Sequence, residues 1–141
     1  MMTLRLAVFG LMVGFAAVAN AGGRVRITEH IDADNKSTYW FITQEALTNI
    51  PEWKVDGPLP LPVEKAVAKA MEWIKKRNAK FTEWAVASIS LGKIWDSDLK
   101  NRWYYSVSVN GTVDVDGIKA NSYLSVIILM DGTIVEPTDK E

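Results

Sequence analysis

The sequence predicts an α+β fold, in which one long helix packs on an antiparallel sheet of about four strands and an N-terminal hairpin is added. Residues 63–77 place apolar side chains at helical spacing. Several later stretches alternate between apolar and polar residues, as half-buried strands do. The helix is segregated from these strands rather than interleaved with them, which is typical of α+β proteins.

Residues 1–21 have the three-part layout of a secretory signal peptide. Residues 1–5 carry one positive charge, residues 6–18 are almost wholly apolar, and Ala19-Asn20-Ala21 is a small-x-small cleavage site. The apolar run is shorter than the roughly 20 residues that span a bilayer. We therefore expect cleavage after Ala21 and export to the periplasm or the outside of the cell, with an uncleaved anchor as the alternative.

The mature chain, residues 22–141, has the size of a single α+β domain. No second long apolar segment follows the signal peptide, so we expect no stable membrane insertion after cleavage. The full sequence has 16 Lys and Arg residues against 17 Asp and Glu residues, a net charge of −1, and no basic tract. Nucleic acid and anionic membrane surfaces are therefore poor candidate partners. The chain has no cysteine. Small eukaryotic secreted domains usually carry disulfides, so this composition favours a bacterial envelope protein.

Two short strands are expected at the start of the mature chain. Val25 and Ile27 alternate with polar neighbours, residues 32–37 form a polar turn, and residues 38–43 are aromatic and β-branched. These strands are expected to pair as a hairpin. One helical turn is expected over residues 44–49.

A proline-rich connector is predicted over residues 51–62, which contain four of the five prolines. Each proline fixes its own φ and restricts the residue before it, so Pro58-Leu59-Pro60-Leu61-Pro62 should be extended. We interpret it as a stiff connector into the helix, with a docking ligand for an aromatic groove as the alternative. Pro62 suits a helix N-terminus, where its missing N–H costs nothing.

The helix is the clearest element of the sequence. Its apolar stripe is formed by Val63, Ala66, Val67, Ala70, Met71 and Ile74. Charged residues cover the other side. The basic run of residues 75–77 complements the negative end of the helix dipole, and Asn78 is placed to end the helix.

The strand pattern of residues 81–95 changes phase partway along. Trp84 and Val86 lie in one phase and Ile89 and Leu91 in the other, which predicts a bulge or bend near residues 87–88 or near Gly92. Residues 103–109 then alternate over a full strand, and Asn110-Gly111 predicts a turn.

The C-terminal third is expected to hold the central strand. Residues 112–121 are a short added strand or a loop, and residues 123–130 form a strand with a continuous apolar run at 126–130. Such a run fits a strand covered on both faces, or a strand with one face on the helix and the other in a partner. Residues 133–135 are a last short strand after the Asp131-Gly132 turn, and residues 138–141 a loose tail.

Residues 63–136 resemble PepSY-type domains, which are small exported modules with a cystatin-like arrangement of helix and sheet. The resemblance lies in the Ala-spaced helix (Ala66, Ala70), the strand at 84–94, the aromatic strand at 103–109, and the hairpin at 123–135 with its Asp and Gly at the turn. Residues 24–62 have no counterpart. The resemblance implies a non-catalytic module of the cell envelope, often near peptidases, with a suggested inhibitory role. The cystatin-type Gln-x-Val-x-Gly loop is absent from the sequence.

Residue types that carry catalysis or bind metals are scarce. The chain has one histidine, His30, and no cysteine, so it lacks the donor set of a zinc site. His30 is expected to have a structural or surface role. Asp114, Asp116 and Gly117 resemble part of a calcium loop, but residues 118–126 supply no carboxylate, which favours a polar turn. We expect no enzyme activity, no metal and no cofactor.

Aromatic residues offer the strongest signal for binding. Six tryptophans lie in the mature part, and tryptophan is common at binding hot spots. Trp53 in the connector and Trp95 at a strand end are the two most expected to be exposed, and with Pro58 and Pro60 they form the predicted partner-binding surface. The sequence thus predicts an exported non-catalytic binding module for a protein or peptide of the envelope, with peptidase modulation as one form of this role. The alternative is an envelope structural or assembly protein that homo-oligomerises through the sheet strand 126–130.

Overall fold

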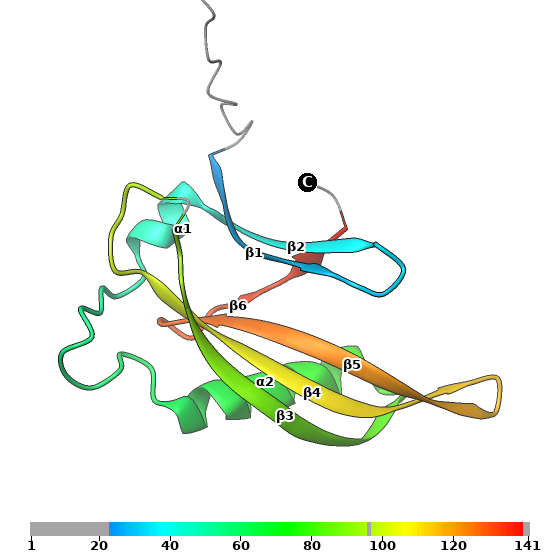
Figure 1. Cartoon of the computed structure of the whole chain (residues 1–141). Helices are drawn as coiled ribbons and strands as arrows, with labels where there is room; N and C mark the ends of the chain where they lie inside the picture. Colours follow the sequence, from blue (N-terminus) through cyan, green and yellow to red (C-terminus); the bar gives the residue numbers. More distant parts are fainter. Residues whose placement is uncertain (1–22, 96, 140–141) are drawn as a thin grey trace, which may run out of the picture.

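One long helix and two antiparallel sheets lie in three layers in the computed structural model, which describes residues 23–95 and 97–139 (Figure 1). The predicted signal peptide, residues 1–21, lies outside the described residues. The elements are, in order, β1 (Arg24–Ile31), β2 (Ser37–Thr43), α1 (Gln44–Thr48), α2 (Val63–Arg77), β3 (Phe81–Lys93), β4 (Trp103–Val115), β5 (Ile118–Leu129), β6 (Ile134–Val135) and β7 (Pro137–Thr138).

The predicted fold class is wrong. The described residues are 49% strand and 17% helix, so the protein is mostly sheet, with two sheets and a second, short helix in place of one helix on one sheet. The hairpin of β1 and β2 is not an added unit, because β7 pairs with β2 and makes a sheet of order β1-β2-β7. Thr138, expected in a loose tail, belongs to this pairing. A two-residue strand that begins with proline carries no strand pattern in the sequence.

The second sheet has the order β3-β4-β5-β6 and forms the middle layer. Helix α2 lies on one of its faces, and its buried residues Ala66, Ala70 and Ile74 point into the core. The predicted start and end of this helix are confirmed, since it follows Pro62 and ends before Asn78.

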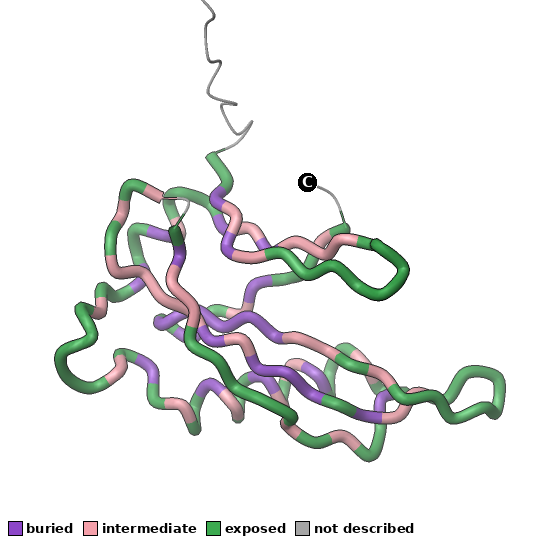
Figure 2. The backbone as a smooth tube through the Cα atoms, viewed as in Figure 1, coloured by how far each residue is buried: buried purple, intermediate pink, exposed green. Residues whose placement is uncertain are grey.

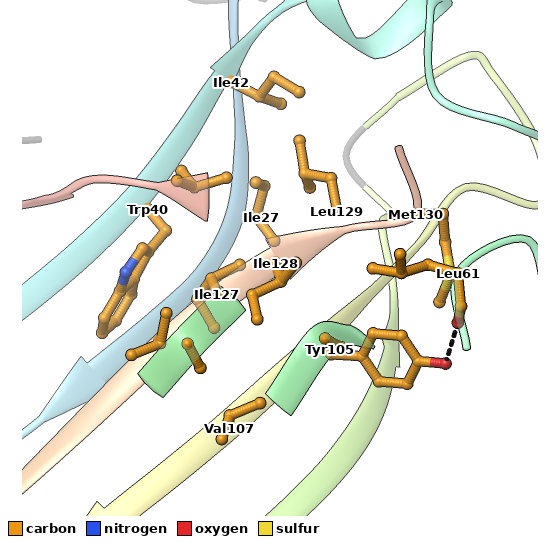
Figure 3. Close-up of a cluster of buried hydrophobic side chains, with 14 of the residues drawn as sticks. Ile27, Trp40, Ile42, Leu61, Tyr105, Val107, Ile127, Ile128, Leu129 and Met130 are labelled. Atoms are coloured by element: carbon orange, nitrogen blue, oxygen red, sulfur yellow. Dashed lines mark hydrogen bonds between the residues drawn. The ribbon is translucent and has the colours of Figure 1, made fainter. Parts of the chain in front are cut away.

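The β1–β2–β7 sheet covers part of the opposite face of the β3–β6 sheet (Figure 1). Ile27, Trp40 and Ile42 of the hairpin lie near Ile127 and Leu129 of β5 in one buried cluster (Figure 3). Burial is concentrated where the three layers overlap, whereas the β1–β2 turn and the far end of the β4–β5 hairpin are exposed (Figure 2).

Strand β5 is the centre of the core. Residues 126–130 are all at most 2% exposed, because α2 covers one face of the strand and the hairpin the other. The expectation of a strand covered on both faces is confirmed. This burial also leaves these residues no surface to offer to a second copy of the chain.

The connector is tied to the core by one buried hydrogen bond. The hydroxyl of Tyr105 in β4 donates to the carbonyl oxygen of Leu61 at 2.7 Å (Figure 3). Burial, and to a smaller extent the charge of Glu64, raise the pKa of Tyr105. The bond fixes the chain immediately before α2 begins.

The predicted bulge is confirmed, but one predicted turn is wrong. The pairing of β3 with β4 shifts between Val86 and Ser88. Asn110-Gly111 lies inside β4 and pairs with β5, so residues 112–121 extend the two long strands. The chain reverses at Asp116 and Gly117, whose φ angles of 53° and 82° suit a tight hairpin turn. Gly111 instead makes room for the ring of Phe81, which lies where a Cβ would be.

No helix in the described part of the chain is long and apolar enough to cross a membrane.

Candidate functional site

Trp53 is held in place by β4 and by the residues immediately before this strand. Its ring lies 5.4 Å from that of Trp103 in an edge-to-face arrangement. The indole N–H of Trp103 donates to the carbonyl oxygen of Trp53 at 2.9 Å, and the backbone N–H of Trp53 donates to the carbonyl oxygen of Asn101 at 3.0 Å. Trp53 is therefore half-buried and fixed rather than freely projecting.

Trp95 lies close to this pair through a shared cation. The Lys93 ammonium lies 4.5 Å from the ring centre of Trp95 and 5.7 Å from that of Trp103. Trp95 is 75% exposed, the largest exposed fraction among the exposed hydrophobic residues of the described chain. We call Trp53, Lys93, Trp95 and Trp103 the tryptophan surface. The structure thus brings together the two tryptophans that the sequence singled out, and adds the two residues that connect them.

An exposed apolar row leads into the tryptophan surface along β3. Ile89 and Leu91 pair with Val107 and Tyr105 of β4, so both lie on the same face of the sheet as Lys93. They are 40% and 37% exposed, because α2 covers β4 and β5 more fully than β3. In the described residues β3 is also an edge strand of its sheet. Strand edges of this kind accept an added strand.

The connector presents its prolines outward. Pro58 and Pro60 are exposed, whereas Leu59 is half-buried and Leu61 buried. The connector folds back on its own Trp53, whose indole N–H donates to the carbonyl oxygen of Gly57 at 3.3 Å. Pro58 therefore lies next to the tryptophan surface, and Pro60 lies two residues further along the same exposed segment.

Val55 adds a strained apolar residue to the connector. Its φ is 69° and its side chain is 61% exposed. A β-branched residue rarely adopts a left-handed conformation, and such strain is found disproportionately at functional sites. The connector thus presents a strained, exposed apolar side chain close in sequence to Trp53.

A second region lies between the two sheets, on the face of the β3–β6 sheet opposite α2. Here a cavity of about 310 Å³ is lined by Thr28, Glu29, His30, Trp40, Ser88, Ser90, Ser106, Ser108, Tyr123, Ser125 and Ile127. We call it the serine cleft. Its floor is an array of hydroxyls, because Ser88 pairs with Ser108 and Ser90 with Ser106, and Ser108 in turn pairs with Ser125.

Two aromatic residues border the serine cleft. The hydroxyl of Tyr123 donates to Ser108 Oγ at 2.6 Å, and the ring lies 6.2 Å from that of His30. Its hydrogen bonding with Ser108, and to a smaller extent with Ser125, lowers the pKa of Tyr123. Trp40 also lines the cleft and is 4% exposed, but its indole N–H is buried without a hydrogen-bond partner among the described residues.

The serine cleft was not predicted from the sequence. His30 was expected to have a structural or surface role, and no role was predicted for the serines of β3 and β4. The signal was present in the alternation of Ser88 and Ser90 and of Ser106 and Ser108, which places four hydroxyls on one face. Only the register between strands shows that they are aligned.

The Asp114–Gly117 segment forms the expected polar turn. The backbone N–H of Gly117 donates to Asp114 Oδ1 at 2.8 Å, so this carboxylate stabilises the hairpin end of β4 and β5. Within residues 23–95 and 97–139, no three His, Cys, Asp or Glu side chains lie close enough together to hold a metal ion.

Comparison of the chain with protein-family models, with curated proteins and with solved structures finds no match.

Proposed function

We propose that this protein is an exported, non-catalytic binding module of the bacterial periplasm or cell envelope, and that it holds an extended peptide segment of a partner protein on the tryptophan surface. The observation that carries the proposal is the exposure of Trp95 beside the fixed pair of Trp53 and Trp103.

The tryptophan surface has the properties of a binding hot spot. Rigid aromatic rings bury much area on binding and lose little conformational entropy. Trp53 is already fixed by backbone hydrogen bonds through Trp103 and Asn101, so part of the ordering cost is met before a partner binds. Lys93 adds a cation that favours an acidic residue or carboxyl-terminus in the partner.

The neighbouring edge of β3 sets the form of the partner. An extended segment that adds to this edge would continue the sheet, with every second side chain on the face of Ile89 and Leu91. Alternate apolar side chains would contact that row. Trp95 would receive the end of the same segment, because it follows Lys93 by two residues.

The two narrower readings have different support. Modulation of a peptidase rests on the resemblance to PepSY-type domains and is a proposal within this one. Homo-oligomerisation through residues 126–130 has no supporting observation, because these residues are buried within the chain.

Affinity capture with matched variants tests the proposal. The purified protein is immobilised, an envelope extract is passed over it, and proteins competed off by free protein are quantified. Trp95→Ala should lower the retention of the specific partner by about thirtyfold, the effect of losing one hot-spot residue. Tyr123→Ala removes another exposed aromatic ring, at the serine cleft, and should leave retention unchanged.

Urea unfolding of both variants accompanies the capture. Since Trp95 is exposed, Trp95→Ala should change the free energy of unfolding by only about 0.5 kcal/mol. Equal retention by Trp95→Ala and the unmodified protein would refute the tryptophan surface as the binding site.

A further inference from the structure

We infer that the serine cleft is a binding site for a neutral saccharide. This inference is independent of the protein-binding proposal, because the cleft lies on the opposite face of the β3–β6 sheet from the Lys93 and Trp103 side chains. Its size of about 310 Å³ is at the lower end of the range for small-molecule sites, which begins at about 300 Å³.

The hydroxyl array is the first argument for this ligand class. Five serines from three adjacent strands line one cavity: Ser88, Ser90, Ser106, Ser108 and Ser125. A serine hydroxyl both donates and accepts hydrogen bonds, and so does each hydroxyl of a sugar. An array of this kind matches a polyhydroxylated ligand better than a ligand that can only accept or only donate.

The charge of the cleft is the second argument. Among the described residues that line it, none is a lysine or arginine, and its carboxylate, Glu29, is ion-paired with Arg26 at 3.6 Å. The paired carboxylate still accepts hydrogen bonds from sugar hydroxyls, and the lining itself holds no lysine or arginine to bind phosphate, sulfate or a carboxylate. The cleft therefore favours a neutral ligand over an anion.

The unpaired indole of Trp40 is the third argument. Buried polar groups are almost always hydrogen-bonded, and an unsatisfied one costs about 1–3 kcal/mol. Trp40 lines the cleft, is 4% exposed, and its indole N–H has no partner among the described residues. The N–H is closed off from the cavity in this structure, so a ligand hydroxyl or ring oxygen would reach it and supply the acceptor only after the side chains over it move aside.

The aromatic border is the fourth argument. Tyr123 is 50% exposed, and its hydroxyl is fixed by Ser108, so the ring is oriented while its surface stays accessible. Sugar rings have an apolar face of C–H groups that packs on aromatic rings. His30, with its ring 6.2 Å from that of Tyr123, forms the other side of the entrance.

The cleft continues along the same sheet face. An open hollow of about 530 Å³ adjoins it at Tyr123 and is lined by Glu83, Ala85, Asn110, Gly111, Thr112, Asn121, Ser122 and Tyr123. Amide and hydroxyl side chains dominate this hollow too. The two spaces together accommodate a ligand longer than one sugar ring, so we expect disaccharides to bind more tightly than monosaccharides.

Titration by NMR tests the inference with defined probes. The indole N–H signal of Trp40 is assigned with Trp40→Phe and followed while glucose, N-acetylglucosamine, cellobiose or chitobiose is added. The expected result is a saturable shift of this signal, larger in affinity for the disaccharides. Inorganic phosphate, added as the anion control, should give no shift.

Variants localise the response. Ser106→Ala should weaken saccharide binding about fivefold, as expected for one neutral hydrogen bond, and Tyr123→Ala should weaken it more than tenfold. Trp95→Ala should leave saccharide binding unchanged, so failure of this inference and failure of the protein-binding proposal are separately visible. The absence of a saturable shift with every probe up to about 50 mM, far above the millimolar range of weak binding, would overturn the inference. So would equal binding by Tyr123→Ala, or a response to phosphate in place of the sugars.

Discussion

The two faces of the β3–β6 sheet are made by alternate residues of the same strands, yet over the serine cleft they differ in burial and polarity. On the helix face, Val107, Val126 and Ile128 are at most 1% exposed. On the other face, the neighbouring residues Ser106 and Ser125 carry hydroxyls and border a cavity. Alternation thus lets one strand stabilise the fold with one set of side chains and offer hydrogen-bonding groups with the other.

The difference follows from what covers each face. Helix α2 closes the helix face over β4 and β5, whereas the β1–β2–β7 sheet covers only part of the opposite face (Figure 1). The hairpin packs near Ile127 and Leu129 (Figure 3). Beyond them the residues that line this face of the sheet are serines. Buried core residues and residues that line the cavity are therefore only one position apart along the chain.

Exchanging the character of two adjacent residues gives the largest expected effect. Val107→Ser removes buried methyl groups and buries a hydroxyl on the helix face, which should lower the free energy of unfolding by about 3 kcal/mol. Ser106→Val places an apolar side chain in the cleft and should change it by less than about 1 kcal/mol. Urea denaturation followed by tryptophan fluorescence measures both. Similar losses in the two variants would show that the cleft face is part of the stabilising core.

Removing one buried hydroxyl gives an intermediate effect. Tyr105→Phe leaves the carbonyl oxygen of Leu61 without its partner in a buried position, which should cost about 1–3 kcal/mol. Tyr123→Phe removes a hydroxyl at the half-exposed cleft, where water replaces the lost bond, so its cost should be smaller. Thermal and urea unfolding of the two variants measure the loss in the free energy of unfolding of each. A larger loss for Tyr123→Phe would reverse the assignment of the two faces.

The smallest effect is expected in alkaline titration. The pKa of Tyr123 is lowered by its serine hydrogen bonds, and the pKa of Tyr105 is raised by burial, each from a usual value of 10.0. Absorbance of tyrosinate should therefore show Tyr123 ionising at a lower pH than Tyr105, and Tyr123→Phe should remove the step at lower pH.

The stabilisation from Tyr105 is complete below pH 10 and is lost as the pH rises through its folded pKa, because the unfolded chain ionises first. The contribution of Tyr123 has the opposite sign and is gained as the pH rises through its lowered pKa. Loss of the later step in Tyr123→Phe would contradict both assignments.

Local patterns predicted single elements well. The stripe from Val63 to Ile74 and the position of Pro62 fixed α2, and the phase change between Val86 and Ile89 located the bulge of β3. Each of these signals is contained within one element, where spacing alone decides the geometry.

Long-range pairing could not be predicted in the same way. The pairing of Trp40 with Pro137 joins residues far apart in sequence, through a strand too short to have a pattern. The chain reverses at Asp116-Gly117 and not at Asn110-Gly111. Both pairs suit a hairpin turn, and only the complete register of β4 with β5 selects between them. The same register aligns the serines.

Strand β7 also determines how force would travel through this protein. The first and last strands of the described chain belong to one sheet, and β7 is held there by its pairing with Tyr39 and Trp40. A load applied at the C-terminal end would therefore be carried to the hairpin above the serine cleft before it reached the sheet covered by α2. Such a load would separate the β1–β2 hairpin from the floor of the serine cleft before it disturbed the rest of the molecule.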